Sequence, residues 1–510
     1  MLKFEAYRNG KPVRGIKLAG AYMFGQDAVP VHADLLAEGH VITCRMNAPE
    51  TCGLALLFDA GAAGAYLLST TRLPERSGPY LLNLELARAR MRELYSKRAD
   101  WALFDFEDAA ELNGEFDELR KKFAHALGTA AVDFAEASLL ADEVLSRAIV
   151  LGEKYALFHA EILSKQRIEV SSSGLPVGCR VNMSASNNGL YVAAMKTFAG
   201  FLSVPMNWRE MVPSEGDYNF KAIDAWMNFA ARENKTLHAG PIIDFSDDSL
   251  PEWLALYQHD YAAVKHIMIE HIRKVVPRYH SYIRVWNVIS GLNSKNTLDM
   301  NFEQISELTR SCCQCIRQIA PDAEIVVELT CPWSEFYARN FHTIPTLLYA
   351  DVIGRSDVPF DAFGLRLLMG VDVDGYYVRD LMQISSLMDE FVWQGKKIHI
   401  TACGVPSSAD PDEQNYWGAE CSVKKAGHWH GLWTRRLQAE WLHALCRLAM
   451  SKSFVKSICW QDMVDISGKI LPNGGLRAGD FKPKLALQEL YSLQGLWKDI
   501  AARPETPDGG

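Results

Sequence analysis

The sequence predicts an α/β protein built on a (β/α)8 barrel, the TIM-barrel fold, preceded by a small all-β module and a helical connector. Two observations predict the barrel. From Gly174 onward, apolar β-type segments alternate with helical patterns, which indicates a parallel sheet. Eight such units over about 320 residues have the size of a (β/α)8 barrel, whose active site lies after the carboxyl ends of its strands. We expect the strands to end near Val181, Val204, Ile243, Ile289, Leu329, Leu367, Thr401 and Trp460.

The first part of the chain, residues 1–86, contains short β-type segments separated by turn signals. Asn9-Gly10, Glu38-Gly39 and Ser77-Gly78-Pro79 are such signals, and residues 41–46 form a predicted strand. These features are typical of a small antiparallel sandwich. We therefore predict a sandwich-like accessory module at the N-terminus.

Residues 87–170 change to a helical period, with apolar residues near 3.6-residue spacing and charged residues between them. We predict two or three helices that link the module to the barrel, pack on both, and carry no chemistry. The barrel domain is expected over residues 171–498, and residues 499–510 are expected to form a disordered tail.

The composition of the 510-residue chain excludes some function classes. Its formal net charge of −9 argues against nucleic-acid and anionic-membrane partners. The first residues, Met1 to Arg8, lack an apolar signal region, and no segment approaches the ~18 apolar residues of a membrane span. We expect a cytoplasmic protein, although a start site assigned too far downstream would hide a signal peptide. Eleven scattered cysteines favour free thiols, and the sequence leaves a homo-oligomer open.

Several segments of the predicted barrel occur in the order seen in one enzyme family. They are Met206-Asn207-Trp208 at strand two, the run from Trp286 to Gly291 at strand four, Asp361 to Leu365 at strand six, and Lys482-Pro483-Lys484 before the last helix. Together they resemble the motifs of family-10 glycoside hydrolases, the xylanase-type barrels, over roughly Gly174 to Leu493. This resemblance implies an endo-1,4-β-xylanase-like protein that acts on glycosidic bonds in xylan or other oligosaccharides and needs no cofactor.

The resemblance also reveals a departure. It places Gly291 at the family's acid/base position and Ala402 at its nucleophile position. A retaining glycosidase needs two carboxylates about 5 to 5.5 Å apart. Neither glycine nor alanine can transfer a proton or form a glycosyl ester, so we expect the ordinary mechanism to be absent. The family's sugar-binding positions differ as well, and carry Val204, Asn207, Asp244, Phe245, Asn287, Arg366 and Leu368 here.

Other carboxylates are predicted at the barrel mouth. Glu328, Asp244 and Asp462 follow or end different strands and are candidate catalytic residues, with Asp247 and Asp465 nearby in sequence. A separation of about 6.5 to 9.5 Å between two of them would allow an inverting mechanism. They could equally be structural ion pairs or acceptors for sugar hydroxyls. We expect substrate contacts from Trp208, Asn287, Arg366, His399, Trp333, Trp433 and Trp460.

The loop after the seventh strand is long and aromatic. Its residues Trp417, Trp429 and Trp433 could stack on sugar rings or pack over the barrel mouth. His428 and His430, with Glu420 or Cys421, could in principle bind a metal. Two histidines on a loop rarely do so, and we predict no metal site. The run Cys312-Cys313-x-Cys315 falls in a helical pattern and is predicted to serve packing.

Two functional hypotheses remain from the sequence. The first is a glycoside hydrolase that acts on oligosaccharides or polysaccharides with a relocated carboxylate set. The second is a non-catalytic glycan-binding or scaffold pseudoenzyme on a xylanase-type barrel. The N-terminal module could bind carbohydrate in either case, or serve as a structural or dimerising lid. Fold resemblance does not separate these hypotheses, because function depends on the site.

Overall fold

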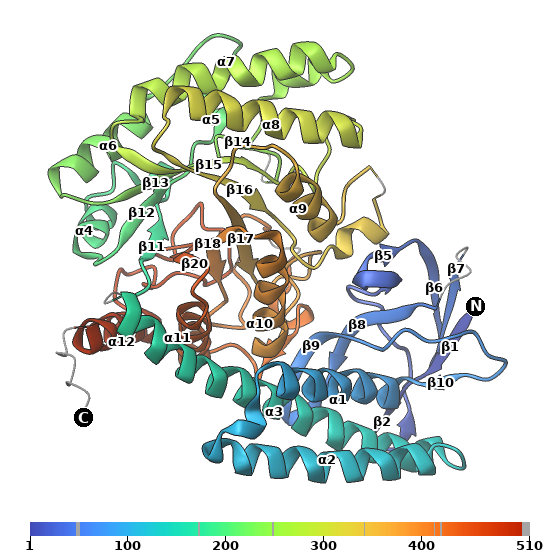
Figure 1. The fold of residues 1–510 in the computed structure, drawn as a ribbon. Coiled ribbons are helices and arrows are strands. Elements are labelled where there is room, and N and C mark those ends of the chain that lie inside the picture. The colour runs from blue at the N-terminus through green and yellow to red at the C-terminus, as the bar shows by residue number, and fades with distance from the viewer. Residues whose placement is uncertain are drawn as a thin grey trace.

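The computed structural model describes residues 1–46, 51–171, 174–246, 249–340, 342–412, 414–418 and 421–501. It contains a closed barrel of eight parallel strands ringed by helices, and a smaller sheet-rich part at the N-terminus (Figure 1). The predicted fold class is confirmed. Among the described residues, no helix has both the length and the apolar character needed to cross a membrane.

The barrel closes because its first strand pairs with both its last strand and its second. Short apolar runs form these strands, and their side chains are buried on both faces of the sheet, as expected for parallel strands covered by helices. The eight strands are β11 (Val177–Arg180), β12 (Phe201–Val204), β13 (Leu237–Ala239), β15 (Ile283–Ser290), β16 (Glu324–Leu329), β17 (Ala362–Leu368), β18 (Lys397–Gly404) and β20 (Val455–Trp460). A short strand, β14 (Ile243–Asp244), continues the third unit and pairs with β15.

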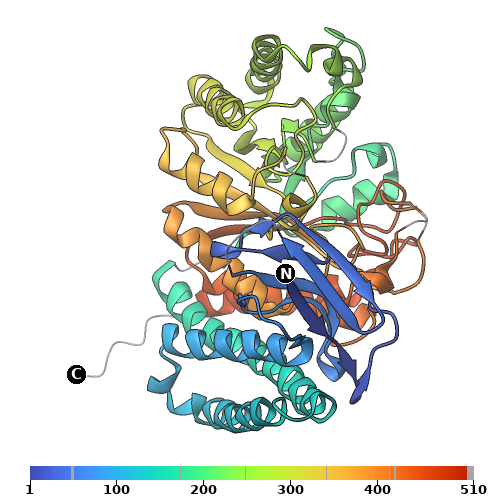
Figure 2. The same ribbon diagram turned by 90° about the vertical axis from the view of Figure 1, so that its right-hand side faces the viewer.

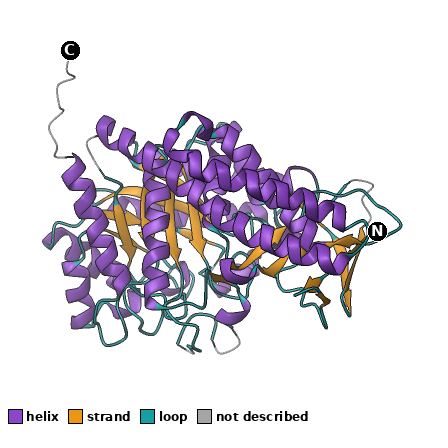
Figure 3. Ribbon diagram, turned by 90° about the horizontal axis from the view of Figure 1, so that it is seen from below, coloured by secondary structure: helices purple, strands orange, loops and turns teal. Residues whose placement is uncertain are grey.

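Amphipathic helices return the chain between the strands and cover the barrel (Figure 3). Several begin at side-chain caps: Asn301 and Asp380 each form a capping box, which satisfies free backbone N–H groups. The helices are α4 (Gly189–Thr197), α5 (Trp208–Met211), α6 (Lys221–Arg232), α7 (Tyr261–Tyr279), α8 (Phe302–Ile319), α9 (Thr346–Arg355), α10 (Leu381–Glu390), α11 (Arg435–Ser451) and α12 (Leu485–Ala501). Cys312, Cys313 and Cys315 are buried free thiols of α8. The predicted tail from residue 502 onward lies outside the described residues.

The N-terminal part contains two small sheets and a hairpin, and most of its strand pairs are antiparallel. One sheet has the order β10 (Tyr80–Leu81), β1 (Leu2–Glu5), β7 (Val41–Met46) and β6 (Ala33–Glu38). The other has the order β19 (His428–Trp429), β9 (Gly64–Ser69), β8 (Gly53–Asp59), β4 (Tyr22–Phe24) and β5 (Pro30–Val31). β2 (Tyr7–Arg8) and β3 (Lys11–Pro12) form the hairpin. Strand β19 comes from the barrel, so one sheet combines both parts of the chain.

Three helices connect the two parts: α1 (Leu82–Asp100), α2 (Ala110–Thr129) and α3 (Phe134–Ser171). The 38-residue α3 runs from the N-terminal strands to the start of the barrel and packs against α1, α2, α10 and α11 (Figure 1). The N-terminal strands lie against the part of the barrel that is coloured orange and red (Figure 2). The N-terminal third therefore packs along the side of the barrel.

Candidate functional site

Two of the predicted carboxylates lie in one row across the carboxyl end of the barrel. The strand register pairs Asp244 with Ser290, and Ser290 with Glu328, on the adjacent strands β14, β15 and β16. Neighbouring strands lie about 4.8 Å apart, so the backbones of Asp244 and Glu328 are about 10 Å apart. The row places a carboxylate on either side of a serine.

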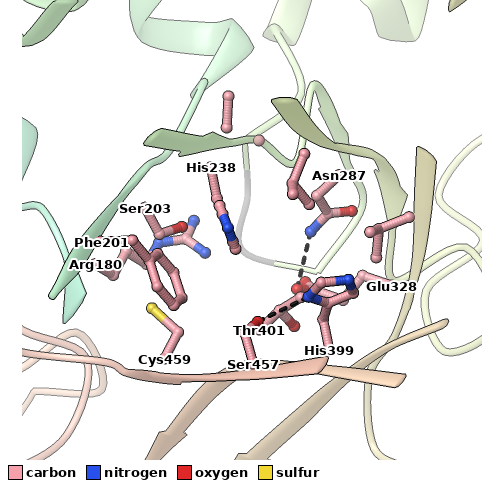
Figure 4. A pocket seen from close by; sticks show the side chains of 14 residues that line it. Arg180, Phe201, Ser203, His238, Asn287, Glu328, His399, Thr401, Ser457 and Cys459 are labelled. Atoms are coloured by element: carbon pink, nitrogen blue, oxygen red, sulfur yellow. Dashed lines mark hydrogen bonds between the residues drawn. The ribbon is translucent and has the colours of Figure 1, made fainter. Parts of the chain in front are cut away.

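Glu328 is held by two neutral donors from the strand beside it. Ser290 Oγ donates a hydrogen bond to Glu328 Oε1 at 2.6 Å. Asn287 Nδ2 donates to Glu328 Oε2 at 2.9 Å, the bond drawn between these two side chains in Figure 4. The Glu328 side chain is only 1% exposed. No lysine or arginine in the described part of the chain forms an ion pair with it. These hydrogen bonds fix the carboxylate inside the barrel.

Asp244 is buried and bound to the turn that follows it. Ser246 donates from its backbone N–H, at 2.8 Å, and from its hydroxyl to Asp244 Oδ1. The same hydroxyl accepts a hydrogen bond from Arg366 Nη1 at 2.6 Å. Arg366, Ser246 and Asp244 therefore form one hydrogen-bonded chain, in which Arg366 and Asp244 are buried and Ser246 is partly exposed. Asp247, the other carboxylate of this loop, lies outside the described residues.

Asp462 occupies a different place, in the loop after β20. Its carboxylate accepts hydrogen bonds from the backbone N–H groups of Ile470 and Leu471, each at 3.2 Å. Burial raises the pKa of Asp462 to about 6, against the lowering effect of these two hydrogen bonds. Asp465 forms an ion pair with the buried Lys484. Both carboxylates thus hold loop structure together.

A small cavity lined by both polar and apolar side chains lies inside the barrel beside Glu328 (Figure 4). Its volume is about 20 Å³, which is enough for a water molecule and far too small for a sugar ring. Its lining includes Arg180, His238, Asn287, Glu328 and His399. Burial lowers the pKa of His238 to about 3, so that ring is neutral near pH 7. The cavity can hold solvent between polar groups.

His399 lies deep in the barrel. Its Nδ1 is 2.7 Å from Ser457 Oγ, and its Nε2 is 3.1 Å from Glu324 Oε1 at the start of β16. The hydrogen bond from His399 lowers the pKa of Glu324. Both partners lie in the amino-terminal halves of their strands, so His399 lies far from the loops of the barrel mouth.

The two positions that the resemblance gives to catalysis are sterically closed. Gly291 has a φ of +71°, and a Cβ there would lie 2.7 Å from the Ser246 backbone nitrogen. Ala402 is 0% exposed. It belongs to an apolar cluster with Leu368, Val371 and Leu471, against which Val373, Tyr376, Trp417, Cys421 and Ile470 pack. A reactive side chain at either position would need a rearranged backbone or a displaced cluster.

The predicted aromatic contacts are mostly buried. Trp208 stacks on His271 of helix α7 with ring centroids 4.1 Å apart, and Trp460 donates from Nε1 to Gly474 O at 2.9 Å. Trp433 is also buried. Trp333 remains partly exposed, and the Arg379 guanidinium lies 4.9 Å from its ring centre. Of these four, Trp333 is the ring most open to a ligand.

Sequence reasoning missed three residues that shape the site. Arg180 ends β11 and points into the cavity, while Ser246 and Ser290 supply the hydroxyls that bind Asp244 and Glu328. Ser290 could have been found from its place at the end of a predicted strand, next to Gly291. Arg180 was harder to find, because the first strand was predicted to end near Val181 and it ends one residue earlier, at Arg180.

Comparison with known proteins bears on the origin of this barrel. The family model described as Glycosyl hydrolase family 10 matches residues 169–326. The match covers the first part of the barrel, which is similar to members of that family. This match confirms the resemblance to family-10 glycoside hydrolases that the sequence motifs predict.

The curated relatives are xylanases of low similarity. Endo-1,4-beta-xylanase B of Neocallimastix patriciarum is 22% identical over 254 residues, covering 47% of this chain and 28% of that protein. Endo-1,4-beta-xylanase 2 of Aureobasidium pullulans is 31% identical over 93 residues, covering 18% of this chain and 25% of that protein. Each alignment thus covers less than a third of the length of the curated relative.

Solved structures of xylanases align with part of this chain. Xylanase 10B from Thermotoga maritima aligns with 16% identity and a TM-score of 0.47, over 66% of this chain and 99% of its own. The family-10 enzyme from Paenibacillus barcinonensis aligns with 17% identity and a TM-score of 0.47, over 65% and 97%.

Proposed function

We propose that this protein is a non-hydrolytic relative of xylanases, a family-10 barrel kept as a glycan-binding or scaffold protein. One observation supports the proposal: both positions that the motif resemblance assigns to the catalytic glutamates are closed. Gly291 has a left-handed backbone against Ser246, and Ala402 lies in the apolar cluster around Leu471. A glycosidase needs two carboxylates that reach the glycosidic bond from opposite sides.

The other carboxylates of the mouth support the same proposal. Glu328 and Asp244 are buried and hydrogen-bonded to serines, and Asp462 binds backbone N–H groups of its own loop. A general acid must come within hydrogen-bond reach of the leaving oxygen. Internal hydrogen bonds would have to break before any of the three could do this.

The ligands to examine first are xylo-oligosaccharides, since the curated relatives are named endo-1,4-beta-xylanases. A bound sugar would meet the polar side of the mouth near Trp333, whose ring is partly exposed. Aromatic rings bind the apolar faces of sugars and leave the hydroxyls free for hydrogen bonds.

The test combines turnover with binding. Purified protein is assayed on aryl xylosides and aryl glucosides, and xylo- and gluco-oligosaccharides are titrated by calorimetry. We expect no turnover and saturable binding of an oligosaccharide, weakened by Trp333→Ala. Turnover that Glu328→Gln abolishes would contradict the proposal. Glu307→Gln, at an exposed helix position paired with Lys265, is the matched control.

A second candidate function is glycoside hydrolysis with Asp462 as the acid. It is favoured by the pKa of about 6 that burial gives Asp462, because a general acid must hold its proton near neutral pH. The discriminating measurement is the pH–rate profile of any activity found. A loss of activity as the pH rises through about 6, on the alkaline limb of the profile, that is absent in Asp462→Asn would favour this candidate.

A further inference from the structure

The loop between β18 and α11 is bound to the N-terminal module as an extra strand. β19 pairs antiparallel with β9, with His428 opposite Ala65 and Trp429 opposite Gly64. The barrel thereby covers an edge of the N-terminal sheet, which would otherwise present unpaired backbone groups. The two backbones are close enough to exclude side chains: a Cβ on Gly64 would lie 2.6 Å from His428 O, and one on Gly427 would lie 2.4 Å from Ala65 O.

A single buried carboxylate of the connector joins two barrel loops. Glu153 of α3 is 4% exposed. Its Oε1 accepts hydrogen bonds from Trp429 Nε1 at 2.7 Å and from the backbone N–H of Leu381 at 3.0 Å. Its Oε2 lies 2.8 Å from His430 Nε2. Glu153 therefore binds both the loop after the seventh strand and the first turn of α10, which follows the sixth.

The buried pair of Arg90 and Asp380 reinforces the second of these contacts. Arg90 of α1 binds the carboxylate of Asp380, which caps α10. Both side chains are almost fully buried, so removing either one would leave a buried, unpaired charge and would strongly destabilise the fold. The loop before α10 is further held by the backbone N–H of Leu67, which donates to Val378 O at 3.0 Å.

The loop after the fifth strand is held in the same way. Arg339 donates from Nη2 to Ala21 O, at 3.0 Å, and pairs with Asp374 at 2.6 Å. The short 3-10 helix Glu335–Ala338 of this loop packs against β4 and β5. Three consecutive loops of the barrel mouth are therefore bound by the N-terminal third of the chain.

Two of these loops also build the apolar cluster over Ala402. Val371, Val373 and Tyr376 come from the loop after the sixth strand, and Trp417 and Cys421 come from the loop after the seventh. The segments that cover the mouth are thus the segments that the N-terminal part fixes. We propose that the N-terminal module and helices α1 and α3 act as an intramolecular clamp that keeps this cluster closed over the barrel mouth.

Loosening the clamp is expected to open the cluster while the rest of the fold stays intact. Cys421 reports this opening, because its thiol is half-buried beside Asp372 and burial raises its pKa to about 12. Exposure would increase the thiolate fraction and the access of an alkylating reagent. Cys312, Cys313 and Cys446 are buried in helices and report global unfolding.

The experiment measures alkylation of each cysteine by maleimide in the full chain, followed by peptide mass spectrometry. Gly64→Ala introduces the clash with His428 O, and Gly61→Ala is the control, since Gly61 also has a positive φ, +67°, with no atom within 4 Å of a Cβ. We expect Cys421 to react severalfold faster in Gly64→Ala and at the wild-type rate in Gly61→Ala.

Glu153→Gln keeps an acceptor for Trp429 but removes the charge that faces His430, so it tests the clamp if Gly64→Ala fails to fold. A smaller acceleration at Cys421 is expected. Equal Cys421 rates in wild type, Gly64→Ala and Glu153→Gln would overturn the proposal. So would acceleration at all cysteines together, because it would show that the contacts serve global stability alone.

Discussion

The barrel mouth has two unlike halves. On β14, β15 and β16, polar side chains form a hydrogen-bonded row in which Glu328 and Asp244 keep serine partners. On β17 and β18, the register partners of this row are Gly364 and His399, and nearer the carboxyl ends of these strands Ala402 is enclosed by Leu368 and Leu471. The first half carries the carboxylate and hydroxyl groups typical of a binding or catalytic site, and the second half extends the hydrophobic core.

The difference shows that Gly291 and Ala402, the two positions that the resemblance assigns to catalysis, are closed by different physical means. At Gly291 the obstacle is the backbone, because a left-handed φ and the nearby Ser246 nitrogen leave no space for a side chain. At Ala402 the obstacle is burial, because a carboxylate there would lose its water without gaining a partner. A single substitution cannot reverse both.

The largest effect is expected from Ala402→Glu. Placing an unpaired carboxylate in the apolar cluster should lower the free energy of unfolding by about 3 to 5 kcal/mol, measured by urea denaturation. Ala225→Glu, on the exposed face of α6, is the control and should change it little. A stable Ala402→Glu protein would show that this half of the mouth is open to solvent.

A smaller effect is expected on how the free energy of unfolding changes with pH. The folded pKa of Asp462 is raised to about 6 from 3.8, so the folded state binds its proton more tightly than the unfolded state. As pH rises from about 3 to about 7, wild type should lose on the order of 2 to 3 kcal/mol relative to Asp462→Asn. Unfolding curves across this range test it, and a constant difference would show that Asp462 has an ordinary pKa.

Next in size is Gly291→Ala, compared with Gly216→Ala. Both glycines have a positive φ, +71° and +81°, but a Cβ on Gly216 meets nothing within 4 Å. The left-handed conformation should cost each variant about 1 kcal/mol, and the clash with Ser246 should cost Gly291→Ala about 1 to 2 kcal/mol more. Equal losses of unfolding free energy would mean that the Ser246 loop moves aside freely.

The smallest effect on stability is expected from Glu328→Gln, at about 1 to 2 kcal/mol. The new amide can accept from Asn287 and donate to the Ser290 hydroxyl, so two neutral hydrogen bonds replace two charge-assisted ones, which are stronger. Thermal unfolding measures it against Glu307→Gln. A stabilised Glu328→Gln protein would indicate that the buried carboxylate is strained, as in a functional site.

Much of the barrel could be predicted from the sequence because its signals are local. β-branched runs that end in polar turns placed the strand ends at Val204, Leu329 and Trp460, where the structure also ends them. Glu328 was expected at a strand end facing the pocket, and it lines the cavity. The same short stretch of sequence determines both where a strand ends and which side chain lies at that end.

The contacts between distant segments could not be predicted in this way. The helical connector was predicted to carry charged residues between its apolar positions and no chemistry, and one of these charged residues, Glu153, is buried and accepts a hydrogen bond from Trp429. The aromatic loop was predicted to be a ligand wall or simple packing, and part of it is a strand of the N-terminal sheet. Pairing between residues so far apart depends on the assembled fold, which no local pattern encodes.

The central claim, that the closed mouth cannot hydrolyse glycosides, is tested most directly in a single-turnover experiment. Xylo-oligosaccharides are incubated with excess protein for long times, and products are separated by chromatography. The predicted result is no shortened product above a protein-free blank. Shortened oligosaccharides that form with wild type and disappear with Glu328→Gln or Asp462→Asn would contradict the claim.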